Sequence, residues 1–126
     1  MNLLLVGLGG AFGAICRYLL GAQVGRSLGT AWPYGTLAAN VIGGLLMGVL
    51  IGALAYRGGA DQEKWRLLLG VGVLGGFTTF SAFSLETALM IERKTYFAAA
   101  GYSLISVVLS VSALFAGLLL IRRMFA

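Results

Sequence analysis

Two phenylalanines and two serines, each pair three residues apart in a long apolar stretch, are the side chains best suited to handle a small ion. At this spacing Phe80 and Phe83 share one face of a helix, and so do Ser81 and Ser84. The edge of a phenyl ring is electropositive, so two ring edges can surround a small anion without adding a formal charge. Serine hydroxyls can donate hydrogen bonds beside them. Phenylalanine pairs also serve as ordinary packing, so this pair alone does not assign a function.

Other polar side chains interrupt the neighbouring apolar stretches. The amide of Asn40 is costly in hydrocarbon unless it is paired. It could donate to an anion or bond to a second helix, and the sequence leaves both uses open. Tyr102, Ser106 and Ser110 follow one another at four-residue steps and make one hydroxyl stripe. A watery path needs such a stripe, although serine hydroxyls can also bond back to their own helix.

Two ionisable residues lie inside apolar runs, and such residues are candidates for function when they are buried in a membrane. Arg17 is expected near the end of its span, where it could extend to the interface and draw anions into a vestibule. Glu86 is expected to pair with Arg17 or with a nearby hydroxyl. Each is therefore predicted to be a vestibule charge or a structural charge.

The segment from Gly75 to Ser81, Gly-Gly-Phe-Thr-Thr-Phe-Ser, places two glycines and three hydroxyls in the middle of a helix-length apolar stretch. Glycine and β-branched threonine weaken a helix. Hydroxyls can satisfy the backbone groups that a break releases, and a break at membrane depth is tolerated where it is buried or lines a watery path. The residues alone leave a break and an uninterrupted helix equally open.

Composition indicates that these residues belong to an integral membrane protein. Hydrophobic residues make up 60% of the chain and charged residues 10%, with a mean hydropathy of +0.96. Soluble domains carry about 25% charged residues. Since a span needs about 20 residues, the 126-residue chain can hold four. We predict one all-α domain, 1–126, with spans at 2–21, 35–56, 65–91 and 96–121.

Several classes of function are excluded by the residues that are missing. The chain has no histidine and a single cysteine, Cys16. An intrachain disulfide framework, a zinc site and a histidine-based hydrolase are therefore ruled out, and we predict that the protein is not an enzyme. The net charge of +5 comes from residues at the ends of the apolar runs, where lipid headgroups lie. It indicates contact with membrane lipid and not with nucleic acid.

The connectors are predicted to be short. Arg26 is assigned to the connector after the first span, and Pro33 marks the entry to the second, where a missing N–H costs little. The remaining loops are expected at 57–64 and 92–94. With four spans, both termini and the second loop share one side of the membrane. That side carries five positive charges: Arg57, Lys64, Arg66, Arg122 and Arg123. The other side carries three, Arg26, Arg93 and Lys94, and Arg17 is close enough to join them. So small a bias favours insertion in both orientations.

Glycine recurs at a spacing of four residues in the first two spans. Gly9 and Gly13 share one helix face, and Gly44, Gly48 and Gly52 share another. Small residues at this interval allow helix backbones to approach closely in lipid. We predict tight helix packing there.

Over essentially its whole length the sequence resembles the Fluc (CrcB-type) fluoride channels. Three motifs carry the resemblance: GGAFGAICRY at 9–18, GTLAAN at 35–40 and GGFTTFSAFSLE at 75–86. The last is the most specific, because it joins the predicted break to the phenylalanine pair and the acid. The resemblance implies a multi-pass protein of the bacterial inner membrane that forms an antiparallel, dual-topology homodimer and exports toxic fluoride passively through two pores.

The resemblance also implies roles for single residues. Phe80 and Phe83 would line the pores with their ring edges, and Asn40 would be a polar pore residue. The backbone carbonyls of Gly75 and Thr78 would hold a structural sodium ion at the centre of the dimer. The other residues assigned to the fluoride path are hydroxyl-bearing: Ser81, Ser84, Tyr102, Ser106 and Ser110.

The strongest alternative function is a small multidrug-type, proton-coupled antiporter, which is also built from four helices. Such a transporter needs a buried acid that faces its cavity. Here the first span contains an arginine and no acid, and Glu86 lies close to the third loop. A second alternative, a structural subunit that transports nothing, would need neither a helix break nor a polar stripe.

Overall fold

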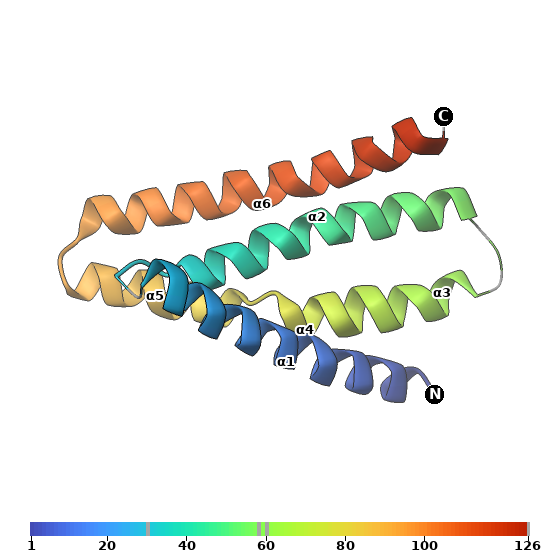
Figure 1. The fold of residues 1–126 in the computed structure, drawn as a ribbon, viewed down its shortest axis with the longest axis horizontal. Helices are drawn as coiled ribbons and strands as arrows, with labels where there is room; N and C mark the ends of the chain where they lie inside the picture. Colours follow the sequence, from blue (N-terminus) through green and yellow to red (C-terminus); the bar gives the residue numbers. More distant parts are fainter. Residues whose placement is uncertain (30, 58, 60, 126) are drawn as a thin grey trace.

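The computed structural model describes residues 1–29, 31–57, 59 and 61–125. Its elements are α1 (Asn2–Leu28), α2 (Tyr34–Arg57), α3 (Gln62–Trp65), η1 (Arg66–Leu74), α4 (Gly75–Phe77), α5 (Phe80–Glu92) and α6 (Tyr96–Phe125). Figure 1 shows α3, α4 and α5 following one another along one long rod, to which η1 also belongs. Both termini lie at the same end as the connection between α2 and α3, as predicted.

Four helical segments of the described residues are long and apolar enough to cross a membrane: Asn2–Leu28, Tyr34–Arg57, Gln62–Glu92 and Tyr96–Phe125. Many of their large apolar side chains point outward. The exposed fractions of Leu3 and Phe97 are 89% and 95%. Lipid would cover these side chains, so the prediction of an all-α protein with four spans is confirmed.

The predicted end of the first span was wrong. We expected it near residue 21, with Arg26 in a connector, but α1 continues to Leu28 and has Arg26 in its last turn. There the Arg26 guanidinium donates to the side-chain oxygen of Gln23 at 2.7 Å, a contact one helical turn apart. The helix ends at Gly29, whose φ of 83° lies in the left-handed region that glycine adopts at low cost.

The other predicted bounds agree more closely with the structure. Pro33 directly precedes α2, as expected. The third span begins three residues earlier than predicted, at Gln62, and α6 continues past the arginine pair to Phe125. Of the predicted loop 57–64, Gly58 and Ala60 lie outside the described residues.

The glycines bring backbones together along two seams. α2 packs along α6, where a Cβ on Gly44 would lie 2.6 Å from the Ser110 carbonyl oxygen. α1 packs along η1, where a Cβ on Gly9 would lie 2.5 Å from the Leu68 carbonyl oxygen. Both distances are too short for a side chain, so the predicted tight packing is confirmed.

The stretch η1 is a π-helix, which the sequence did not predict. Its nine residues, Arg66–Leu74, have wider turns than the α-helices on either side. This stretch leads directly into α4 and the break that follows. Wide turns of this kind often occur near functional sites.

Candidate functional site

The third span is interrupted at two threonines, which confirms the predicted break. α4 ends at Phe77, and the next residues are extended, Thr78 with φ −84° and ψ 158° and Thr79 with φ −150° and ψ 121°. The threonine side chains stabilise both sides of the break. The Thr78 hydroxyl donates to the Leu74 carbonyl at 2.9 Å, and the Thr79 hydroxyl caps α5 by accepting from the Ala82 N–H at 3.1 Å.

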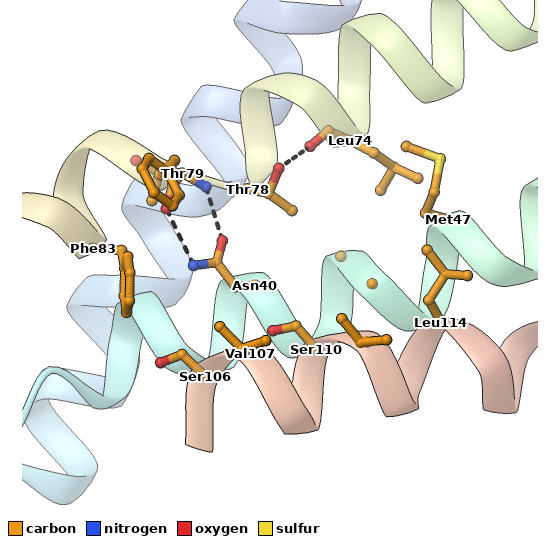
Figure 2. Close-up of a pocket in the computed structure, with 14 residues that line it drawn as sticks. Asn40, Met47, Leu74, Thr78, Thr79, Phe83, Ser106, Val107, Ser110 and Leu114 are labelled. Atoms are coloured by element: carbon orange, nitrogen blue, oxygen red, sulfur yellow. Dashed lines mark hydrogen bonds between the residues drawn. The ribbon is translucent and has the colours of Figure 1, made fainter. Parts of the chain in front are cut away.

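Asn40 on α2 holds the break by two hydrogen bonds to one residue. Its Oδ1 accepts from the Thr79 N–H at 2.9 Å, and its Nδ2 donates to the Thr79 carbonyl at 3.1 Å (Figure 2). The helix-to-helix use that the sequence left open is therefore present. An amide nitrogen carries two hydrogens, so one N–H of Asn40 is not needed for this contact.

Arg17 does not lie where the sequence suggested. We expected it near the end of the first span, but residues 18–28 continue α1 beyond it. Its side chain is half-buried, and Nε donates to the Gly76 carbonyl at 3.3 Å. The guanidinium also borders a cavity of about 290 Å³ that extends to Thr79. The structure therefore gives Arg17 a backbone partner on the third span.

A larger groove, of about 420 Å³, lies between the break, α2, α5 and α6. Figure 2 shows the break on one side of it and the serines of α6 on the other. The groove brings together five of the predicted pore residues with the predicted sodium ligand Thr78. Those five are Asn40, Phe80, Phe83, Ser106 and Ser110.

The two serines of α6 give the groove its most informative feature. The Oγ atoms of Ser106 and Ser110 are buried and have no hydrogen-bond partner within the described residues. The alternative, a bond back to their own helix, is therefore not found among the described residues. A buried hydroxyl without a partner costs about 1–3 kcal/mol. A ligand or water in the groove would offset that cost.

The phenylalanine pair lies where α5 starts. The ring centroids of Phe80 and Phe83 are 5.5 Å apart, so the two residues share a face as predicted. Phe80 is 78% exposed although it borders the polar break. An aromatic ring in this position is available to a ligand or to a second protein surface.

Tyr102 and Glu86 lie behind the groove and not in its lining. Tyr102 is completely buried, its ring centroid is 5.2 Å from that of Phe83, and its hydroxyl donates to Glu86 Oε1 at 3.3 Å. Of the two partners considered for Glu86, a hydroxyl is thus found and Arg17 is not. Trp32 contacts Tyr102 edge-on, with ring centroids 5.8 Å apart.

Ser81 and Ser84, also predicted to line the path, are exposed and lie outside the groove of this chain. Ser81 Oγ lies 3.2 Å from Thr79 Oγ1.

The carbonyls of Gly75 and Thr78, the predicted sodium ligands, have lost the donors that a continuous helix would supply. In an α-helix they would accept from the N–H groups of Thr79 and Ala82. Here the Thr79 N–H donates to Asn40 and the Ala82 N–H donates to the Thr79 hydroxyl. Carbonyl oxygens released in this way are suitable ligands for a hard cation.

Sequence reasoning missed two residues of the site. Thr79 borders both cavities, accepts from and donates to Asn40, and caps α5. A threonine directly before a helix start is a recognisable N-cap signal, so its capping role could have been predicted. Trp32 was not predicted to contact Tyr102, and no sequence signal connects the two residues.

Comparisons with known proteins agree with the resemblance stated above. The family model described as "CrcB-like protein, Camphor Resistance (CrcB)" matches residues 4–118. A protein of Phenylobacterium zucineum (strain HLK1) named "Fluoride-specific ion channel FluC" is 72% identical over 124 residues, which cover 98% of each chain. A protein of the same name from Caulobacter sp. (strain K31) is 64% identical over 99% of this chain and 98% of the relative. Another from Rhodopseudomonas palustris (strain BisB5) is 52% identical over 97% of this chain and 98% of the relative.

Proposed function

This chain belongs to the CrcB family of fluoride-specific ion channels, and we propose that it conducts fluoride passively across a bacterial membrane. It is a multi-pass membrane protein and not an enzyme. The observation that carries the proposal is the pair of buried, unpartnered serine hydroxyls in a groove bordered by Phe80 and Phe83. A small anion that has lost part of its water can accept from these hydroxyls.

The groove residues contribute two kinds of interaction to a small anion: hydrogen bonds and weak positive potential. The hydroxyls of Ser106 and Ser110 and the second N–H of Asn40 donate hydrogen bonds, while the phenyl ring edges of Phe80 and Phe83 add weak positive potential. Among the described residues that line the groove, none carries a formal charge. Binding therefore stays weak enough for the ion to leave, as conduction requires.

The proton-coupled antiporter is less well supported. Such a mechanism needs an acid that faces the cavity, and Glu86 does not line the groove. Its carboxylate accepts from the buried Tyr102 hydroxyl instead.

A second, inverted copy completes the path in this proposal. One chain supplies only part of the groove wall, and the largely exposed Phe80 ring leaves an apolar surface beside a polar break. With Arg17 in the interior of α1, positive charges near the span ends number five on one side and three on the other (Arg26, Arg93, Lys94). That small bias supports insertion in both orientations, and a two-fold axis in the membrane plane would bring two breaks together.

We assign a sodium ion to this meeting point. The Gly75 and Thr78 carbonyls fit it because their helical donors are engaged elsewhere. When bound, the ion would supply positive charge that joins the two breaks. Thr78→Ser should be tolerated, because the ligand is backbone, whereas replacing sodium on both sides by a large organic cation should impair the protein. Full flux after prolonged sodium removal would contradict the assignment.

Fluoride and chloride efflux from liposomes that contain the purified protein tests the main proposal. We expect rapid fluoride efflux and no chloride efflux. Equal rates for both ions, or fluoride efflux that depends on a proton gradient, would reject a fluoride channel.

Dual topology is tested with Asp61→Cys in a Cys16→Ala background. A membrane-impermeant reagent should label it from both faces of sealed vesicles, and labelling from one face only would reject antiparallel assembly.

A further inference from the structure

Arg17 occupies an unusual position for a charged residue. It lies in the interior of a membrane-length helix, and the one ion pair of the described residues, Arg66–Glu63, does not involve it. A guanidinium within hydrocarbon is costly unless it has a partner. Its partner here is the carbonyl of Gly76, which accepts from Nε at 3.3 Å.

That carbonyl belongs to the last turn of the half-helix formed by α3, η1 and α4. The C-terminal end of a helix carries partial negative charge on its unpaired carbonyls, so a cation there is stabilising. Close backbone contact fixes the position, since a Cβ on Gly13 would lie 2.9 Å from the Phe77 nitrogen. Arg17 follows Gly13 by one helical turn, so the packing of α1 aims its side chain at the end of the half-helix.

Two carbonyls at the break have donors from other helices. Those of Gly76 and Thr79 accept from side chains of other helices, Gly76 from Arg17 and Thr79 from Asn40. Those of Gly75 and Thr78 have lost their helical donors, as described above.

We infer that Arg17 is a positioning residue for the cation site. By holding the Gly76 carbonyl toward α1, it fixes the orientation of the adjacent peptide groups and leaves the Gly75 and Thr78 carbonyls to the cation. This inference rests on the proposed sodium ion. It assigns to Arg17 a role in forming the site, in place of attracting anions from a vestibule.

The charge of Arg17 and its position make opposite predictions. On charge alone, a guanidinium near a cation site repels the cation, and its removal should tighten sodium binding. If Arg17 positions the carbonyls, its removal should weaken sodium binding. The direction of the change therefore separates the two effects.

The test is thermal unfolding of the purified protein in detergent, with sodium chloride titrated against N-methyl-D-glucamine chloride at constant ionic strength. A ligand that binds only the folded state raises the unfolding temperature with its concentration. In Arg17→Met we expect the half-saturating sodium concentration to rise about tenfold, equivalent to about 1.4 kcal/mol. The control Arg26→Met removes a positive charge from the exposed last turn of the same helix and should leave the concentration unchanged.

A half-saturating concentration that is unchanged or lower in Arg17→Met overturns the inference. If Arg17→Met does not fold, Arg17→Lys replaces it. Lysine keeps the charge but lacks the rigid guanidinium, so it should still weaken sodium binding. Sodium binding as tight as in the unmodified protein would overturn the inference in that variant as well.

Hydrogen exchange of residues 74–82 distinguishes failure of the sodium assignment from failure of this inference. If sodium does not raise the unfolding temperature of the unmodified protein, the assigned ion is wrong. The role of Arg17 in positioning the break is then decided by the hydrogen-exchange rates alone. Faster exchange at 78–82 in Arg17→Met, but not in Arg26→Met, upholds the role of Arg17 in positioning the break. Unchanged exchange overturns it.

Discussion

Replacing Ser110 by alanine distinguishes a hydroxyl that serves the ion from one that serves the fold. The Ser110 hydroxyl is buried and has no partner within the part of the chain that the structure describes. A hydroxyl that supported the fold would contribute about 0.5–1.5 kcal/mol, which its removal would forfeit. An unpartnered one costs about 1–3 kcal/mol, so its removal should leave the free energy of unfolding unchanged or higher.

Ser112 supplies the control for this experiment. It lies on the same helix but is exposed, so Ser112→Ala shares the gain in helix propensity, about 0.5 kcal/mol, and does not alter the groove. Equilibrium unfolding of both variants in the same mixed micelles gives the difference due to the buried hydroxyl. We expect Ser110→Ala to be at least as stable as Ser112→Ala.

Fluoride flux should respond in the opposite direction. A hydrogen bond to a charged partner contributes about 1.5–3 kcal/mol, so losing one on the conduction path should slow flux roughly tenfold or more. A fluoride electrode measures the efflux from liposomes. The reasoning is refuted if Ser110→Ala is less stable than Ser112→Ala by about 1 kcal/mol or more, because the hydroxyl then has a partner in the protein. Equal flux in the two variants refutes it also.

Five further substitutions test other parts of the structure. Phe80→Ile and Phe83→Ile keep apolar bulk but lack the ring quadrupole, so each should slow fluoride efflux roughly tenfold or more in a folded protein, and unchanged efflux in both would remove the rings from the path. Gly48→Ala should destabilise the protein by about 1–3 kcal/mol or more in micelle unfolding, because the new Cβ would lie 2.9 Å from the Leu114 carbonyl carbon, and normal stability would contradict the close seam between α2 and α6. Trp32→Leu should lose about 0.5–1.5 kcal/mol by losing the edge-on contact with the buried tyrosine of α6, and Trp32→Phe should recover much of it.

The spans could be predicted from sequence because their signal is local. Apolar runs of about 20 residues specify helices in a membrane whatever surrounds them. The first span was predicted too short because Gln23, Arg26 and Ser27 are polar, although none of them stops a helix. The helix stops at Gly29, where the backbone becomes left-handed. The π-helical stretch before the break has no such local signal, and its wide turns were not foreseen.

The groove was predicted only in part because its contacts are distant in sequence. Hydroxyl spacing grouped Ser106 with Tyr102, yet Tyr102 is turned into the core, where it meets Glu86. The hydrogen bond from Asn40 to Thr79 joins residues 39 positions apart in the sequence. The hydrogen bond from Arg17 to Gly76 joins residues 59 positions apart. Periodicity identifies which face a residue occupies, but not which neighbour that face meets.

The order of residues in the chain bears on how the broken span enters the membrane during synthesis. Unpaired carbonyls exposed to hydrocarbon are costly, so an isolated third span would favour a continuous helix. The side chains that hold the break, Arg17 and Asn40, belong to the first two spans, which leave the ribosome earlier. When the third span inserts, both partners already lie within the bilayer. The break can therefore form by docking against α1 and α2, and a nascent chain that stops short of the fourth span already contains both side chains of other spans that bond to it.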